Sequence, residues 1–195
     1  MSPRLSAVGR VSRIVLLAAA LAGALALAGC GNREEERTLA ETEGLYLDIG
    51  GLKYQVQVSR YLNANDVEDK SYLLGLPEGT PQPAGDETWF GVFLRVQNET
   101  DEPLPAADTF EIIDTQENVF RPIPLDREQN PFAYQAVDVP PNTVIPEPDE
   151  AAEQGPVQGS LLLFKIPTES LQNRPLEFRF SNGPQGTVGV VDLDV

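Results

Sequence analysis

This chain almost entirely lacks the two side chains that enzymes use most often as general base and thiol nucleophile, histidine and cysteine. Cys30 is the only cysteine, and the chain has no histidine. Without imidazole there is no Ser-His-Asp triad, and the usual general base and commonest transition-metal ligand are missing. None of the three lysines follows a serine by three residues, as a Ser-Lys pair requires. We therefore expect no enzymatic activity and no cofactor, although 30 acidic residues leave a chance carboxylate pair for glycoside hydrolysis open.

The surroundings of Cys30 give it one specific chemistry. A basic segment, an apolar segment over residues 14–29 and small residues before the cysteine follow one another, which is the order of a secretion signal. The last four residues resemble the lipobox of bacterial lipoprotein signal peptides: Leu27, Ala28, Gly29 and Cys30. The resemblance implies cleavage between Gly29 and Cys30 and a diacylglycerol thioether on the Cys30 sulfur. The signal peptide would then be residues 1–29.

Two other interpretations of this segment are an ordinary secretion signal and a membrane span. The apolar segment has sixteen residues, fewer than the roughly 20 that cross a bilayer comfortably. An exported protein with one unmodified cysteine would carry a free thiol, whereas lipidation gives Cys30 a role. Two or three acyl chains hold a protein stably on a membrane. We expect a lipid anchor on the extracytoplasmic face of the cell membrane.

The charge of the chain limits its partners. The net charge is −16, and it would become −19 without residues 1–29, which contain three arginines and no acid. Because affinity for phosphates depends on lysine and arginine, we expect no binding to nucleic acid and no charge-based contact with anionic lipids. The polar segment 30–45 is predicted to be a flexible tether. Residues 46–195 are predicted to form one domain, which is large enough to fold without disulfides.

A group of oxygen-bearing side chains lies between residues 63 and 69. Its members are Asn63, Asn65, Asp66, Glu68 and Asp69. Such ligands suit a hard cation such as calcium. The spacing differs from an EF-hand loop, which has glycine at its sixth position and glutamate at its twelfth, because Glu68 and Leu74 stand there. The alternative is a solvated turn rich in Asn and Asp.

A second candidate site is one face of an apolar strand. Trp89, Gly91 and Phe93 alternate with other residues on this face. A glycine between two aromatic residues could leave an apolar groove for a ligand or a protein partner. The alternative is that residues 61–85, which carry several leucines and tyrosines, cover the face as part of the core.

The rest of the chain has the pattern of an all-β domain. Period-two alternation predicts a strand over residues 52–58 with one buried face. Residues 88–97 are predicted to form a strand whose end over residues 89–93 is apolar on both faces, which predicts a central strand. Further strands are predicted over residues 109–114 and 119–123 as a hairpin, and over 159–166, 176–181 and 187–193, with one helical turn in 167–173. Short strands without a long amphipathic helix indicate an antiparallel β-sandwich.

Three stretches carry a resemblance to a known family, and they are residues 89–98, 110–115 and 159–167. Together they resemble the telokin-like, immunoglobulin-like extracellular domain of Gram-positive lipoproteins, a family of unknown function. The resemblance covers residues 46–182 and contains no catalytic signature. It implies an immunoglobulin-like sandwich on a lipid anchor.

These observations lead to two functional hypotheses. The first is a lipid-anchored, non-enzymatic module that interacts with another protein of the cell envelope or acts as its accessory. The second is a lipoprotein that binds a small solute or a cation such as calcium. The absence of catalytic residues and the expected anchor at Cys30 favour the first.

Overall fold

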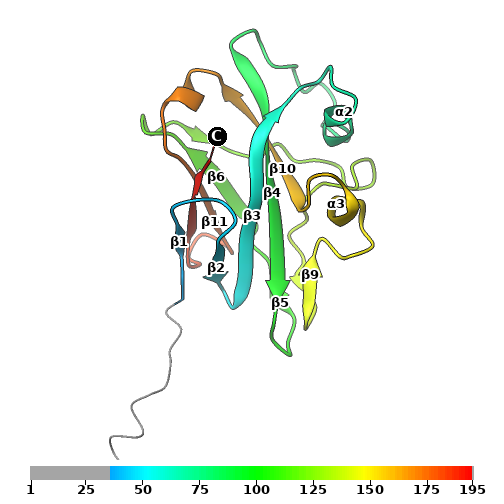
Figure 1. The fold of residues 1–195 in the computed structure, drawn as a ribbon, viewed down its shortest axis with the longest axis vertical. Helices are drawn as coiled ribbons and strands as arrows, with labels where there is room; N and C mark the ends of the chain where they lie inside the picture. Colours follow the sequence, from blue (N-terminus) through cyan, green and yellow to red (C-terminus); the bar gives the residue numbers. More distant parts are fainter. Residues whose placement is uncertain (1–35, 195) are drawn as a thin grey trace, which may run out of the picture. The chain divides into compact units, whose positions relative to one another are not determined.

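The computed structural model describes residues 36–194, which fold into two packed β-sheets (Figure 1). The predicted signal peptide over residues 1–29, with its cleavage site at Gly29 and the lipidation site at Cys30, lies outside the described residues. Within residues 36–194, no helix is long and apolar enough to cross a membrane.

One sheet, here called the β4 sheet, is antiparallel and has the order β10-β4-β3-β2, with β9 pairing with the end of β4. Its strands are β2 (Tyr46–Ile49), β3 (Leu52–Leu62), β4 (Glu87–Asn98), β9 (Thr143–Ile145) and β10 (Ser160–Pro167). The predicted central strand is confirmed, because β4 pairs on one side with β3 and on the other with β10. Its two apolar faces are both buried.

The other sheet, here called the β11 sheet, has the order β1-β12-β11-β6-β7. Its strands are β1 (Leu39–Ala40), β6 (Thr109–Ile113), β7 (Val119–Phe120), β11 (Leu176–Ser181) and β12 (Gly189–Leu193). All its neighbours are antiparallel except β1 and β12. A short pair, β5 (Leu104–Pro105) with β8 (Asp138–Val139), and the helical turns α2 (Asp69–Tyr72), α3 (Ala151–Gln154) and η2 (Ser170–Gln172) complete the fold. The predicted β-sandwich is confirmed.

The N-terminal boundary of the domain differs from the prediction. Residues 36–45, which the sequence placed in a flexible tether, belong to the fold. Leu39 and Ala40 pair with Val190 and Val191 of β12, and Ala40 is buried. The Asp48 N–H donates to the Arg37 carbonyl at 2.7 Å. These backbone bonds to sheet edges order a segment whose own composition is too polar to form a core.

Strand β3 departs from the predicted alternation at its centre. The register between β3 and β4 shifts between Val56 and Val58, which marks a β-bulge. Because side chains alternate along a strand, one extra residue sends the following side chains to the opposite faces. Val56 therefore packs in the core between the sheets, whereas Val58 and Leu62 pack on the other side of the β4 sheet.

The predicted hairpin over residues 109–123 is shorter than expected. β7 ends at Phe120, and the Ile123 N–H then donates to the Leu163 carbonyl of β10 at 2.7 Å. Pro122 and Pro124 flank Ile123, and proline cannot donate to a sheet ladder. The chain therefore leaves the β11 sheet here and runs along the edge of the β4 sheet.

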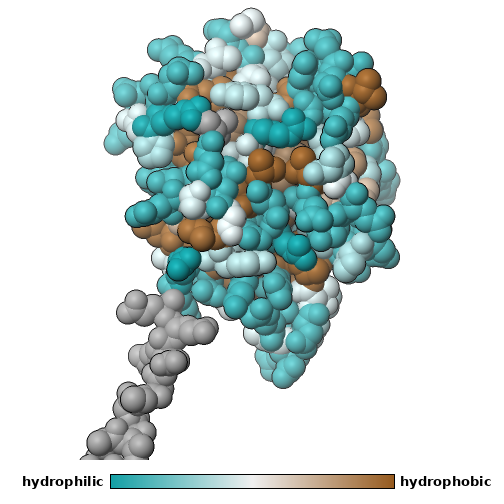
Figure 2. Space-filling view, in the orientation of Figure 1, coloured by the Kyte–Doolittle hydropathy of each residue, from teal (hydrophilic) through white to brown (hydrophobic). Residues whose placement is uncertain are grey.

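Apolar side chains form two separate clusters, one on each face of the β4 sheet. The main core lies between the two sheets and includes Phe90, Leu94, Phe164 and Phe178. The other group, here called the outer cluster, has six buried members: Leu62, Tyr72, Trp89, Phe93, Leu161 and Leu163. On the face shown in Figure 2, the surface is mostly hydrophilic and its apolar areas are small and separate.

Candidate functional site

The strand face proposed from sequence as a partner patch is buried. Trp89 is 2 % exposed, Phe93 is fully buried, and both belong to the outer cluster. A Cβ atom on Gly91 would lie 3.0 Å from Leu161 Cδ1 and 3.2 Å from Leu62 Cδ1. Neighbouring side chains therefore fill the space next to this glycine. The hypothesis of an open groove at Trp89, Gly91 and Phe93 is therefore wrong, and the alternative of a covered face is correct.

The cover over this face comes from the long β3–β4 connection and from residues 126–132. The Tyr72 ring of α2 packs edge-on against Phe93 and Phe132, with ring centroids 5.1 and 4.9 Å apart. The side-chain amide of Asn130, which is fully buried, donates to the Tyr72 and Leu74 carbonyls at 3.0 Å each. Its Oδ1 accepts from the Phe132 N–H. One asparagine thus ties both covering segments together.

Three residues of the proposed cation loop, Asn63, Asp66 and Asp69, use side-chain oxygen atoms to bind groups of the protein itself. Asp69 is 4 % exposed, pairs with the Arg60 guanidinium and accepts the Asn63 N–H at 2.7 Å. Asp66 Oδ1 accepts the N–H groups of Glu68 and Asp69 at the start of α2. The Asn63 side chain accepts the Asn65 N–H. Residues 36–194 contain no group of three or more Asp, Glu, His or Cys placed to hold a metal ion, so the loop has the geometry of an Asx-rich turn.

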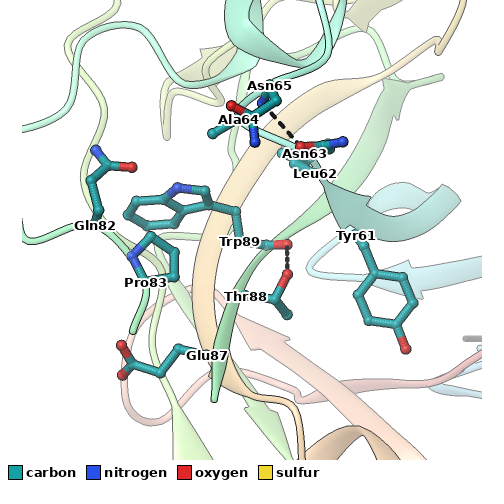
Figure 3. Close-up of a pocket in the computed structure, with 10 residues that line it drawn as sticks. All are labelled: Tyr61, Leu62, Asn63, Ala64, Asn65, Gln82, Pro83, Glu87, Thr88 and Trp89. Carbon is teal, nitrogen blue, oxygen red and sulfur yellow. Dashed lines mark hydrogen bonds between the residues drawn. The ribbon is translucent and has the colours of Figure 1, made fainter. Parts of the chain in front are cut away.

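A cavity of about 420 Å³, here called the end cavity, lies where β3 ends and β4 begins. Ten residues line it (Figure 3): Tyr61, Leu62, Asn63, Ala64, Asn65, Gln82, Pro83, Glu87, Thr88 and Trp89. Leu62 and Trp89 face each other across the two strands, so the sheet itself brings the two ends of the connection together. The cavity is larger than the others described, whose volumes are about 200–250 Å³.

Glu87 is the one ionisable carboxylate of the end cavity. The Ala84 N–H donates to its Oε2 at 3.0 Å, and Lys165 Nζ lies 3.3 Å from the same oxygen. The bond from Ala84 lowers the pKa of Glu87 below its usual value, and Lys165 lowers it further against the opposing effect of desolvation. Glu87 therefore stays ionised at neutral pH, with Oε1 left to accept a hydrogen bond from solvent or ligand.

Trp89 contributes an unsatisfied donor to the end cavity. Its indole N–H is buried and has no hydrogen-bond partner among the described residues. Figure 3 shows the indole beside Pro83 and Gln82, with its nitrogen on the edge that faces Ala64 and Asn65. Buried polar groups in native proteins are nearly always paired with protein or water, so this donor is a candidate contact for a water molecule or a ligand.

The end cavity was not predicted from the sequence. Its walls come from residues 61–65 and 82–89, and the sequence alone does not show that the ends of this connection meet. Asn63, Asn65 and Trp89 were singled out, but for a cation loop and an apolar patch that the structure does not form. The one available signal was that the strands predicted over residues 52–58 and 88–97 follow each other along the chain, as paired neighbours in a sheet often do.

No protein-family model matches this chain, and no curated protein matches it. Solved structures that are similar to it include the yjhA protein from Bacillus subtilis, at 10% identity, TM-score 0.45, 79% of this chain and 99% of that one. An uncharacterized β-sandwich protein from Clostridium difficile 630 has 12% identity and TM-score 0.45 over 82% of this chain and 97% of that one. A putative lipoprotein, ycdA, from Bacillus subtilis has 16% identity and TM-score 0.42 over 78% of this chain and 39% of that one.

Proposed function

We propose that this protein is a lipid-anchored, non-enzymatic binding module on the extracytoplasmic side of the cell envelope, and that it presents its end cavity away from the membrane. The membrane contact is the lipid on Cys30, and the partner is another component of the envelope rather than nucleic acid. The observation that carries the proposal is the place where the chain enters the sandwich.

The chain enters at the end opposite the end cavity. The Arg37 carbonyl bonds to the Asp48 N–H. Asp48 pairs with Lys53 of β3, and Lys53 pairs with Gln97 near the end of β4. The end cavity lies at the other end of the same ladder, at the pair Leu62 and Trp89. The strand between these points is about 30 Å long at 3.3 Å per residue.

The link between Cys30 and the sandwich is short. Residues 31–35 separate Cys30 from Glu36, and a chain of this length reaches at most about 20 Å. A lipid on Cys30 would therefore keep the Arg37 end of the domain close to the membrane, with the end cavity facing outward. A net charge near −19 would keep the surface from adhering to anionic lipid headgroups, so the cavity stays accessible.

The anchor is tested by acylation and by fractionation. Cells would be grown with an alkyne-labelled fatty acid, and the wild-type protein would be compared with Cys30→Ala and with the neighbouring control Asn32→Ala. We expect the label and membrane association in the wild type and the control, and loss of both in Cys30→Ala. Unlabelled wild-type protein, or a Cys30→Ala variant that stays in the membrane fraction, would refute the anchor.

The orientation is tested with single engineered cysteines, because the native cysteine would be blocked by lipid. A fluorophore would be attached at Gln82→Cys, beside the end cavity, or at Asp101→Cys, in the turn after β4. Quencher-bearing lipids in the same membrane should quench the label at position 101 strongly and the label at position 82 weakly. Equal quenching would contradict an outward-facing end cavity.

Solute binding is the second candidate function, and the end cavity favours it. The cation form of that hypothesis has less support, because the oxygens of Asp66 and Asp69 already accept bonds within the loop. Calorimetry of the purified protein with calcium would revive it if heat were released at a stoichiometry of one.

A further inference from the structure

We infer that the end cavity is a binding site for a neutral saccharide. This inference deepens the proposed function, because it names the ligand class of the surface that the anchored protein would present. Charge, hydrogen-bonding capacity and the position of the only tryptophan each support it.

The charges around the end cavity select against ionic ligands. None of its ten lining residues is lysine or arginine. Two cations next to the lining residues are already paired: Lys165 lies 3.3 Å from Glu87, and Arg60 pairs with Asp69. A phosphate, sulfate or carboxylate would therefore meet an ionised carboxylate in a strongly acidic protein, without a partner of opposite charge. A divalent cation needs six or more oxygens, of which a single carboxylate supplies only two. The site suits an uncharged molecule.

The polar groups of the end cavity are matched to hydroxyl groups. The side-chain amides of Asn65 and Gln82 make no hydrogen bond within residues 36–194, and both side chains are exposed to solvent. An amide presents an acceptor and two donors together, and each sugar hydroxyl is both donor and acceptor. Oε1 of Glu87 adds one acceptor to the lining of the cavity. A polyhydroxylated ring can thus satisfy these groups in pairs.

The buried side of the end cavity supplies a donor and an apolar contact. The indole N–H of Trp89 has no partner within residues 36–194, and a ligand hydroxyl that reached it would satisfy it. Pro83 lies beside the indole (Figure 3) and offers C–H surface to the apolar face of a sugar ring. The volume of about 420 Å³ falls within the usual range for small-molecule sites. The cavity is open to solvent, so a saccharide chain could place its end there while the rest of it stays outside.

Trp89 makes the inference directly measurable, because it is the only tryptophan of the chain. The full-length protein, purified in detergent, would be titrated with maltotriose and with triacetylchitotriose while indole emission and heat are recorded. Glucose 6-phosphate and triglycine serve as an anionic and a peptide probe. We expect a saturable change in emission and heat with at least one neutral saccharide. No response to either saccharide, or an equal response to glucose 6-phosphate or triglycine, would overturn the inference.

Two substitutions locate the binding. Gln82→Ala and Asn65→Ala should each weaken saccharide binding about tenfold, as expected for the loss of hydrogen bonds to a ligand. The matched control is Gln116→Ala, which removes an exposed amide from the β6–β7 turn. All three variants should unfold at the same denaturant concentration as the wild type. Unchanged affinity in both cavity variants would place the ligand elsewhere and overturn the inference.

The outcomes of these experiments do not depend on the outcomes of the experiments on the anchor. Loss of the acyl label from Cys30→Ala does not depend on any ligand, and the titrations do not depend on a membrane. A protein that is acylated but binds no saccharide would refute only the ligand, whereas saccharide binding by an unacylated wild type would refute only the anchor.

Discussion

The two faces of β4 pack in different ways. On one face, Phe90 and Leu94 belong to the main core, where strands of both sheets meet and the rings of Phe110, Phe164, Phe178 and Phe180 contact one another. On the other face, Trp89 and Phe93 are covered by connecting segments with little regular structure. Hydrogen bonds from side chains such as Asn130 hold that cover in place. One strand therefore supports both the fold and, at the margin of its less regular cover, the candidate site.

The largest effect is expected in the main core. Phe178 is fully buried, and Phe178→Ala should lower the free energy of unfolding by about 4 kcal/mol because it leaves a cavity between two sheets that cannot collapse. Denaturant unfolding followed by circular dichroism measures this. The control is Val119→Ala, a partly exposed residue of β7, which should change stability by less than about 0.5 kcal/mol. Similar values for both variants would mean that the main core is not the principal source of stability.

A smaller and more local effect is expected in the outer cluster. Tyr72→Ala removes the ring that packs on Phe93 and Phe132. The free energy of unfolding of the whole domain should fall by about 2 kcal/mol, because the irregular cover can open locally at a lower free-energy cost than the whole domain unfolds. The emission of Trp89 should shift to the red as water reaches the indole. A loss as large as that of Phe178→Ala, without a red shift, would show that both clusters unfold as one unit.

Removing the amide that ties the cover should have a somewhat smaller effect. Asn130→Ala leaves the Tyr72 and Leu74 carbonyls without their donor, which should cost about 1.5 kcal/mol. Amide hydrogen exchange should accelerate in residues 63–76 and stay unchanged in β11. Gln129→Ala, an exposed neighbour, is the control. Faster exchange spread evenly over both sheets would contradict a local tie.

The β11 sheet has a comparable polar tie, and it responds to pH. Burial alone would raise the pKa of Asp114, but hydrogen bonds from Asn118, Asn173 and the Gln116 N–H lower it to about 2. Because the folded pKa lies below the unfolded value near 3.8, the carboxylate stabilises the fold fully above pH 4. That stabilisation is lost as the pH falls toward 2.

Asp114→Asn should therefore lower the free energy of unfolding by about 1 kcal/mol at pH 7. The difference in stability between this variant and the wild type should shrink between pH 4 and pH 2. Thermal unfolding over this range measures it. A constant difference at all pH values would mean that the charge of Asp114 contributes nothing.

Strand positions could be predicted from the sequence wherever a regular alternation reflects burial, as in β4 and β11. Features that depend on partners distant in sequence could not. Residues 36–45 look like a tether because they are polar, and only β12 and Asp48 order them. The bulge in β3 is equally hidden, because Val56 and Val58 are chemically alike and nothing local shows that they point to opposite faces.

The candidate site shows the same limit. Asp69 has the composition of a cation ligand, but Arg60 and the Asn63 N–H occupy its oxygens. The sequence identifies which residues could bind, whereas the packing of the β3–β4 connection decides whether their atoms are free. Gln82 lies in a Pro-rich stretch without a recognisable pattern. Only the structure, which places this stretch beside Trp89, identifies Gln82 as a candidate binding residue.

The parallel pairing of β1 with β12 has a consequence for the order of synthesis. Leu39 cannot pair with Val190 until that residue is made, about 150 residues later. At ordinary translation rates this takes roughly 10–30 s. The first strand of the domain therefore lacks its sheet partner while the rest of the chain is being made, and only the bond from Asp48 to Arg37 can form early. Whatever modifies or captures the emerging N-terminus has this interval in which to act, before the final strand closes over it.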